Sequence, residues 1–170
     1  MSVDDHLLYL SEADVENAAI PLDALREAAA AAFVAKARGT AQVAPKSVLT
    51  LGPGHVFQAK PSVLRDAGLA GMKWFGLVPR AQTTGPTITG LILLSDVTSG
   101  PPVAVMGANW ITALRTGAMS AIATQYLARP DTTSIGFVGT MASNYVSLQL
   151  RPPADLGAAL ATRCGQGSHG

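Results

Sequence analysis

A succession of short extended runs between residues 40 and 107 constrains the fold of this chain more than any other feature. The runs are Gln42–Ala44, Val48–Leu51, His55–Ala59, Met72–Val78, Thr87–Ser95 and Pro102–Met106. Pro45 and the segment Gly52-Pro53-Gly54 separate the first of them, and short apolar runs bounded by such residues are typical of strands. We therefore expect a sheet in which Thr87–Met106 forms a hairpin that turns at Asp96–Gly100. The unbroken apolar run Leu91–Leu94 predicts burial on both faces.

Helical patterns flank the predicted strands. Leu22–Arg38 is rich in alanine and places apolar residues along one face, and Gly39 follows it where a left-handed cap belongs. Trp110–Ala128 carries an apolar stripe behind Asn109, which is a candidate N-cap.

The N-terminal part predicts two smaller elements. Leu7–Leu10 is a short apolar strand candidate. Ser11 then predicts the start of a helix over Glu12–Ala19, with Asp14 as its capping-box partner.

Composition narrows the class of partner. The 170 residues are 48% hydrophobic and 14% charged, against about 25% charged in average globular proteins, which excludes a disordered chain. The net charge of +1 offers no basic stripe, so we expect no nucleic-acid partner. The low charge also predicts that a partner subunit or a missing piece of chain covers some apolar surface.

The cysteine, the histidines and the apolar stretches predict neither a metal site nor a membrane span. Cys164 is the single cysteine, and the three histidines are far apart in sequence, so metal-ligand spacing is absent. Met1–His6 lacks the basic region of a signal peptide. Ala28–Ala37, the longest apolar-leaning stretch, is too short to cross a bilayer. We expect a cytoplasmic protein.

Four blocks of sequence resemble, in order and spacing, the ornithine cyclodeaminase/mu-crystallin family. They are GMKWFG (Gly71–Gly76), TITGLILLSDVTSGPP (Thr87–Pro102), ITALRTGAMSAIATQYLARPD (Ile111–Asp131) and SIGFVGT (Ser134–Thr140). The resemblance implies a homodimer with two domains in each chain. One, residues 1–130, would be an α+β domain with a mixed sheet and flanking helices that binds substrate and forms the dimer. Residues 131–170 would begin a Rossmann domain for NAD or NADP.

The resemblance also implies a reaction. In the family's ornithine chemistry, the cofactor takes the α-hydride from ornithine, the side-chain amine attacks the resulting imine, ammonia leaves, and the returning hydride gives proline. Relatives reduce cyclic ketimines or interconvert amino and keto acids, so a ketimine reductase or an alanine dehydrogenase-like oxidoreductase is an alternative. The substrate in each case is a small amino or imino acid.

The sequence departs from the family after the predicted strand Ser134–Gly139. The dinucleotide fingerprint has only its first glycine, Gly139, and Met141 stands where the second is expected. We expect a truncated Rossmann domain with a frameshifted tail after Thr140, weak or no NAD binding and no turnover. A genuine short helix over Leu156–Arg163 is the alternative interpretation of the tail.

The resemblance implies site roles for three cationic residues and one threonine of this chain. Lys73 and Arg115 match groups that bind the substrate carboxylate, and Arg115 and Thr87 match groups that contact the cofactor. Lys46 stands where the family usually has arginine, and a lysine offers a point charge in place of two parallel hydrogen bonds. Each has a structural alternative: a surface lysine, an ion pair for the arginine, or strand propensity for the threonine. The resemblance places the family's catalytic aspartate further along, in the Rossmann half, so no residue here matches it. Asp96 lies in the predicted hairpin turn, and we assign it a turn role.

Two functional classes follow. The first is an enzyme-family fragment with substrate-side residues but no catalytic residue. The second is a non-catalytic interaction protein, whose dimer face pairs with itself or with a longer homologue.

Overall fold

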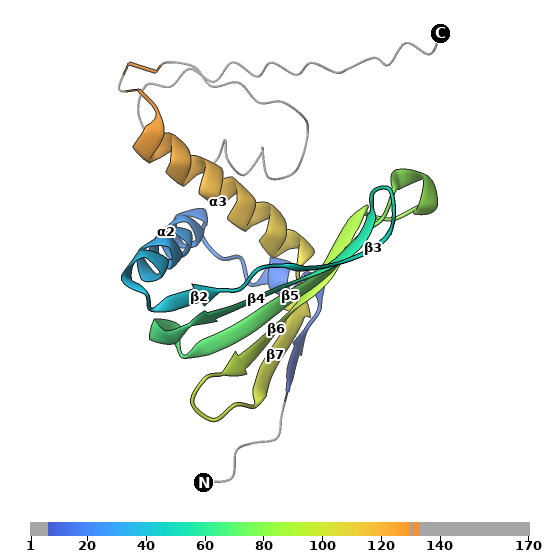
Figure 1. Cartoon of the computed structure of the whole chain (residues 1–170). Helices are drawn as coiled ribbons and strands as arrows, with labels where there is room; N and C mark the ends of the chain where they lie inside the picture. The colour runs from blue at the N-terminus through green and yellow to red at the C-terminus, as the bar shows by residue number, and fades with distance from the viewer. Residues whose placement is uncertain (1–6, 130, 133–170) are drawn as a thin grey trace. The chain divides into compact units, whose positions relative to one another are not determined.

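The structure is a computed structural model that describes residues 7–129 and 131–132 (Figure 1). The chain divides into two compact units. Among the described residues, one comprises residues 7–19 and 31–111, and the other comprises residues 20–30, 112–129 and 131–132. The sheet and the predicted lysine site belong to the first unit, and Arg115 belongs to the second.

A mixed sheet of seven strands forms the first unit. The strands are β1 (Leu8–Leu10), β2 (Ala41–Val43), β3 (Ser47–Gly52), β4 (His55–Leu64), β5 (Leu69–Leu77), β6 (Ile88–Asp96) and β7 (Pro102–Gly107). Their order is β1-β7-β6-β5-β4-β2, and β3 also pairs with β4. Strands β1 and β7 are parallel, and the other pairs are antiparallel. The predicted α+β class with a mixed sheet is confirmed.

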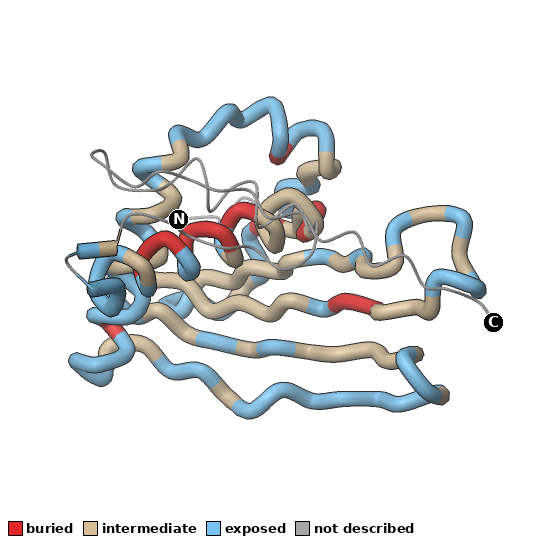
Figure 2. The backbone as a smooth tube through the Cα atoms, turned by 90° about the horizontal axis from the view of Figure 1, so that it is seen from above, coloured by how far each residue is buried: buried red, intermediate tan, exposed pale blue. Residues whose placement is uncertain are grey.

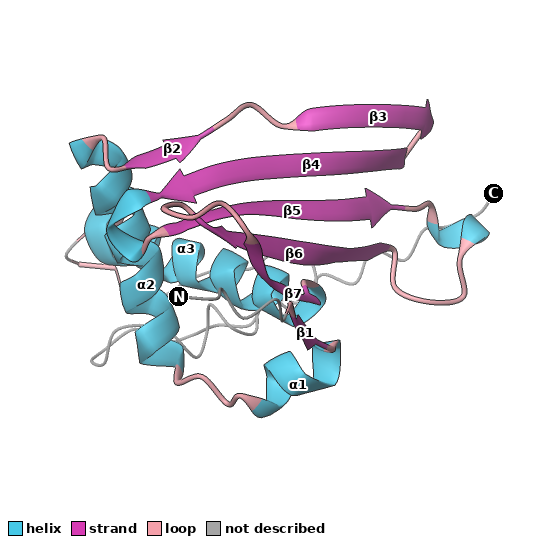
Figure 3. Cartoon of the chain, turned by 90° about the horizontal axis from the view of Figure 1, so that it is seen from below, coloured by secondary structure: helices cyan, strands magenta, loops and turns pink. Residues whose placement is uncertain are grey.

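Strand β4 is twice as long as the predicted run because it continues through Pro61. The carbonyl of Pro61 accepts a hydrogen bond from the Ala44 amide at 3.2 Å, so the missing N–H of the proline faces the same edge. That edge is shared end to end by β2 and β3 (Figure 3). The proline lies at the break between them, where the ladder loses no bond.

The described part of the chain contains three α-helices. They are α1 (Glu12–Asn17), α2 (Leu22–Arg38) and α3 (Asn109–Leu127). The predicted capping box of α1 is confirmed: the Asp14 amide donates to Ser11 Oγ at 3.2 Å, and the Ser11 amide donates to Asp14 Oδ2 at 2.8 Å. Gly39 follows α2 with a φ of 77°, which is the left-handed conformation expected of it.

The N-terminus of α3 meets a carboxylate from α1. The amides of Asn109 and Trp110 donate to the Glu12 carboxylate, the first at 3.2 Å. A negative charge there satisfies amides that the helix leaves unpaired and matches the positive end of the helix dipole. Gly107 makes room for this contact, since a Cβ at residue 107 would lie 2.5 Å from Glu12 Oε2. The sequence suggested Asn109 as the cap, whereas Asn109 is the first residue of α3.

The sheet exposes apolar side chains. Figure 2 shows buried residues only in short stretches of the tube. The expected burial of Leu91–Leu94 on both faces is wrong, because Leu91 is 44% exposed. The two neighbours of β6 are antiparallel strands, and such sheets can leave one face open to solvent.

Some expectations fall outside the described residues. The predicted strand Ser134–Gly139, the fingerprint at Gly139 and the tail after Thr140 belong to this group. The boundary between residues 130 and 131 therefore stays a prediction. Within the described residues, no helix combines the length and the apolar character that a bilayer span requires.

Candidate functional site

Lys73 occupies the middle of β5, between β4 and β6. It pairs directly with Lys60 on β4 and with Ile92 on β6. Directly paired residues share a face of the sheet, so both lysines lie on the same face. The Nζ atom of Lys73 lies 4.5 Å from the centre of the Phe75 ring, two residues further along β5.

Lys60 is a neighbour of Lys73 that the sequence analysis did not single out. Its Nζ atom lies 5.1 Å from the centre of the same Phe75 ring. Two ammonium groups therefore share one aromatic ring, an arrangement in which the ring quadrupole attracts each cation. Alternation along β4 places Lys60 on one face of that strand. It cannot identify Lys73 as the neighbour of Lys60 until the register of β4 and β5 is known.

Lys46 lies beside this pair. It directly precedes Ser47, which pairs with Ala59, and Lys60 directly follows Ala59. Lys46 and Lys60 are thus the residues that flank the last pair of the β3–β4 ladder. We call Lys46, Lys60 and Lys73 the lysine row. Lys46 and Lys60 are exposed and Lys73 is half-buried.

Phe75 is a fixed platform beneath the ammonium groups. It is 8% exposed and pairs with Gly90 on β6. A Cβ at residue 90 would lie 2.5 Å from the Phe75 Cβ and 2.8 Å from the Phe75 Cα. Glycine at this position therefore allows the two strands to approach each other where Phe75 is held. Phe75 is thus a buried residue of the sheet.

The charge of this region suits an anion. Like charges on directly opposed residues destabilise a sheet, so a bound anion would relieve the repulsion between Lys60 and Lys73. A carboxylate is a suitable partner, because an ammonium group donates charge-assisted hydrogen bonds to it. The lysine row can hold and orient an acid group, and it offers no acid–base pair by itself.

Arg115 and Thr87 occupy other parts of the chain. Arg115 is an exposed residue of α3, and its Nη1 atom lies 3.6 Å from the sulfur of Met119. Its convergence with Lys46 and Lys73 stays a prediction. Thr87 directly precedes β6 and is half-buried, and its carbonyl accepts a hydrogen bond from the Val78 amide at 2.8 Å. Contact of either residue with a cofactor stays a prediction too.

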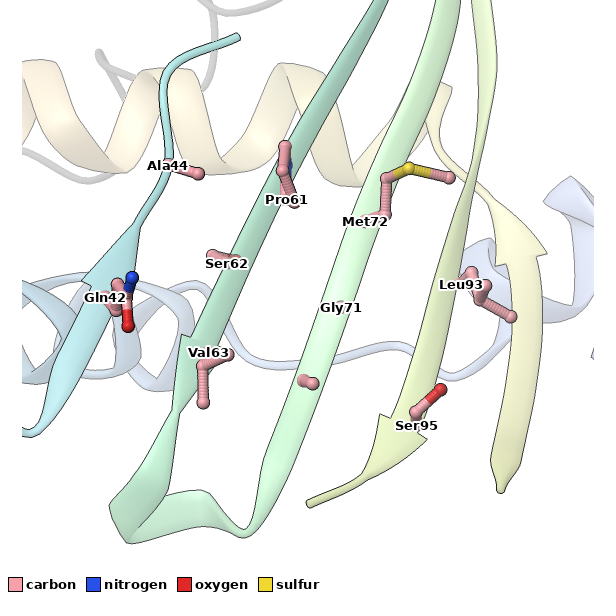
Figure 4. A pocket seen from close by; sticks show the side chains of 10 residues that line it. Gln42, Ala44, Pro61, Ser62, Val63, Gly71, Met72, Leu93 and Ser95 are labelled. Carbon is pink, nitrogen blue, oxygen red and sulfur yellow. The ribbon is translucent and has the colours of Figure 1, made fainter. Parts of the chain in front are cut away.

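A hollow of about 310 Å³ lies elsewhere on the sheet (Figure 4). Pro61, Met72 and Leu93 line it from three adjacent strands, and their register places them on the face opposite Lys73. None of the predicted site residues lines this hollow. It is mainly apolar, so it suits packing better than it suits the binding of a charged substrate.

The same face carries large exposed apolar side chains. Tyr9, Leu49, Trp74 and Leu91 come from four strands and are 39–66% exposed. Trp74 stacks on Phe57 with ring centres 5.8 Å apart. We call this surface the apolar face. Exposed aromatic and aliphatic side chains on one sheet face are typical of a protein interface.

Asp96 has the turn role that the sequence predicts. Its Oδ1 atom accepts hydrogen bonds from the Thr98 amide at 2.9 Å and from the Ser99 amide and hydroxyl at 2.7 Å. These bonds, above all those from Ser99, lower the pKa of Asp96 from its ordinary value of 3.8. An Asp96 carboxylate engaged in this way stabilises the hairpin. Among the described residues, no group of three His, Cys, Asp or Glu side chains could hold a metal ion.

Comparison with known proteins identifies the family. The profile of the ornithine cyclodeaminase/mu-crystallin family matches residues 6–150. The chain belongs to this family. It is 38% identical over 152 residues to the alanine dehydrogenase of Archaeoglobus fulgidus, a match that covers 88% of this chain and 46% of that protein.

Two solved structures are similar in fold to this chain. One is an archaeal alanine dehydrogenase dimer with bound NAD (TM-score 0.77, 36% identity, 85% of this chain and 44% of that chain). The other is the Δ1-pyrroline-2-carboxylate reductase of Thermococcus litoralis with NADH and L-proline (TM-score 0.77, 32% identity, 85% of this chain and 45% of that chain). The chain thus spans about half the length of the relatives that it matches.

Proposed function

We propose that this chain provides the substrate-binding half of an NAD(P)-dependent amino-acid or imino-acid enzyme. The cation that holds the substrate carboxylate is Lys73. The observation that carries the proposal is the placement of Lys73 over the Phe75 ring, next to a second lysine. The structural relatives with bound NAD and with L-proline support the chemical class. Both alternatives, a ketimine reductase and an alanine dehydrogenase-like enzyme, share the same carboxylate grip.

The residues of this chain would bind and orient substrate. A nicotinamide cofactor, when bound, supplies hydride transfer at the substrate α-carbon. In the described part of the chain, Arg115 offers a cation to phosphate groups and Thr87 offers a hydroxyl, whereas the glycine turn lies outside it. Met141 replaces the glycine through which a backbone approaches the pyrophosphate. We therefore expect NADH to bind with an affinity well below that of the longer relatives, which calorimetry with NADH measures.

A titration tests the substrate proposal directly. L-alanine, L-proline and L-ornithine would be titrated into the chain while methyl and amide NMR signals are recorded. We expect millimolar binding that perturbs signals of β4 and β5. Lys73→Met removes the charge and should weaken binding about tenfold or more, since a hydrogen bond to a charged group contributes roughly 1.5–3 kcal/mol.

Lys36 provides the matched control. It is an exposed lysine on α2, so Lys36→Met changes the net charge by the same amount away from the site. Its affinity for the amino acids should equal that of the parent chain. If the parent chain, Lys73→Met and Lys36→Met bind the amino acids with equal affinity, Lys73 does not hold the carboxylate. Tight binding only at the opposite face of the sheet would lead to the same conclusion.

A second proposal concerns assembly. We propose that the apolar face pairs with a second copy of the chain, as the exposure of Tyr9, Leu49, Trp74 and Leu91 suggests. One solved relative is a dimer, which supports a second copy as the occupant. Pairing does not require catalysis. It is therefore also the function expected if the chain is a non-catalytic interaction protein.

Light scattering coupled to size-exclusion chromatography tests the pairing. The parent chain should have the mass of two copies, and Leu91→Lys should halve it, because a buried unpaired charge is costly at an interface. Phe33→Lys is the control, since Phe33 is 49% exposed on α2, outside this face. A monomeric parent chain, or a Leu91→Lys protein that stays dimeric, contradicts the pairing.

A further inference from the structure

We propose that His55 makes the pairing of two copies sensitive to pH: the chains pair when this imidazole is neutral and separate when it is protonated. The inference rests on the proposed pairing through the apolar face, and it adds a regulatory group to that face. The observation that carries it is the position of His55 at one end of the face, where its ring continues a row of aromatic rings.

Three rings from β4 and β5 form this row. The ring centres of His55 and Phe57 lie 6.1 Å apart, and those of Phe57 and Trp74 lie 5.8 Å apart. His55 shares the face of Phe57 because it lies two residues before it along β4. The Phe57 ring lies over Gly76, where a Cβ would be 2.8 Å from Phe57 Cε1. His55 therefore contacts an aromatic surface that belongs to the apolar face.

His55 is the strand residue of the apolar face whose charge changes near neutral pH. The register assigns alternate residues of the seven strands to this face. None of these strand residues is Asp, Glu, Lys or Arg. Tyr9 is also ionisable, but a tyrosine titrates near pH 10. The strands of a second copy therefore bring no charged side chain to His55 across this face.

The basic side chains near β4 and β5 offer the imidazolium no counter-charge. Lys60 and Lys73 lie on the opposite face of the sheet. Lys46 precedes Ser47, at the end of β3 away from the β3–β4 turn. Arg80 follows β5, and its Nη1 atom donates to a backbone carbonyl at 2.9 Å. All four groups are cations, so none of them stabilises a positive charge on His55.

The acidic side chains of the sheet unit lie away from His55. Strands β3, β4 and β5 contain no Asp or Glu. Asp66 follows the far end of β4, a strand of ten residues and hence about 30 Å long. Asp96 ends β6 next to the start of β5. Glu12 lies beside Gly107 on β7, where the first amides of α3 donate to its carboxylate, and β5 and β6 separate β7 from β4.

Pairing should therefore depend on the charge of the imidazole. The ordinary pKa of an imidazole is about 6.5, and a charge buried without a partner at an interface is costly. Because the pair excludes the proton, pairing is complete well above this pH and is lost as the pH falls below it. Between pH 8 and pH 5.5 the dissociation constant should rise about a hundredfold, roughly tenfold for the histidine of each copy.

A dilution series of the intact chain, followed by light scattering at pH 8 and at pH 5.5, measures this change. The parent chain should be dimeric at pH 8 and should dissociate at pH 5.5. His55→Phe keeps an aromatic ring and removes the titration, so it should pair equally at both pH values. This variant retains His6 and His169, and it therefore controls for their protonation.

A permanent charge tests the same cause in the opposite direction. His55→Lys should be monomeric even at pH 8, because its ammonium group stays charged there. Phe33→Lys is the matched control, since Phe33 is exposed on α2, outside the apolar face, and it should pair as the parent chain does. A His55→Lys protein that pairs as tightly as Phe33→Lys would contradict the inference.

The outcomes separate this inference from the pairing itself. A parent chain with one dissociation constant at both pH values keeps the pairing and overturns the role of His55, as does a His55→Phe protein that dissociates at pH 5.5 like the parent. A parent chain that is monomeric at pH 8 overturns both. Circular dichroism at both pH values checks the fold, and a parent chain that unfolds at pH 5.5 also overturns the inference.

Discussion

Replacing Gly90 with alanine tests how the sheet holds the Phe75 platform. The new Cβ would lie 2.5 Å from the Phe75 Cβ and 2.8 Å from the Phe75 Cα, and it would also collide with the carbonyl oxygen of Trp74. Two of these atoms belong to the backbone of β5, which is paired on both sides. The collision therefore cannot be relieved by rotating one side chain.

The expected loss of stability follows from two opposing effects. Overpacking of a tight site costs about 1–3 kcal/mol, and backbone atoms place this site at the upper end. Replacing glycine with alanine stiffens the unfolded chain and returns about 0.4–1 kcal/mol. The net loss is about 2 kcal/mol, which lowers Tm by roughly 4–8 °C for a chain of this size.

Urea unfolding monitored by tryptophan fluorescence measures this loss, since the chain has two tryptophans. Gly52→Ala is the matched control, because a Cβ at residue 52 meets nothing within 4 Å. It should change the midpoint little, or raise it slightly. If Gly90→Ala unfolds at the same urea concentration as Gly52→Ala, the close approach of β5 and β6 does not restrain Phe75.

Three further perturbations have defined outcomes. Glu12→Gln should destabilise the chain by about 1 kcal/mol, since it removes the charge at the start of α3, whereas Glu16→Gln on the same helix should leave the urea midpoint unchanged. Asp96→Asn should destabilise the hairpin at pH 6 and less so at pH 3. The lowered pKa of Asp96 means that its contribution is complete above the ordinary value of 3.8 and is lost as the pH falls through the lowered value. The difference in urea midpoint between Asp96→Asn and the parent chain should therefore be smaller at pH 3 than at pH 6. Phe75→Leu should weaken L-alanine binding about two- to fivefold through loss of the cation–π contact, with the same NMR titration as readout and an unchanged affinity as the contradicting result.

The sequence predicts the local elements well. The expected helix Leu22–Arg38 coincides with α2, and the cap at Ser11 and the turn at Asp96 are confirmed. Each of these depends on residues within a few positions of one another. Propensity, capping and turn chemistry act over such distances, so the pattern alone is sufficient.

Longer-range features could not be predicted. Lys60 meets Lys73 only because β4 continues through Pro61 and the hairpin turns just before β5, and a proline ordinarily argues against a continuous strand. Glu12 meets the amides of Asn109 and Trp110 across almost the whole sheet unit. Neither contact leaves a periodic signal, because each depends on how strands align in register.

A co-crystal structure with a small amino acid tests the central claim most directly. The account predicts that the carboxylate lies within about 3 Å of Lys73 Nζ, the usual length of a charge-assisted hydrogen bond, on the face that carries Phe75. A carboxylate bound away from Lys73, or seated in the hollow lined by Met72 and Leu93, would contradict it.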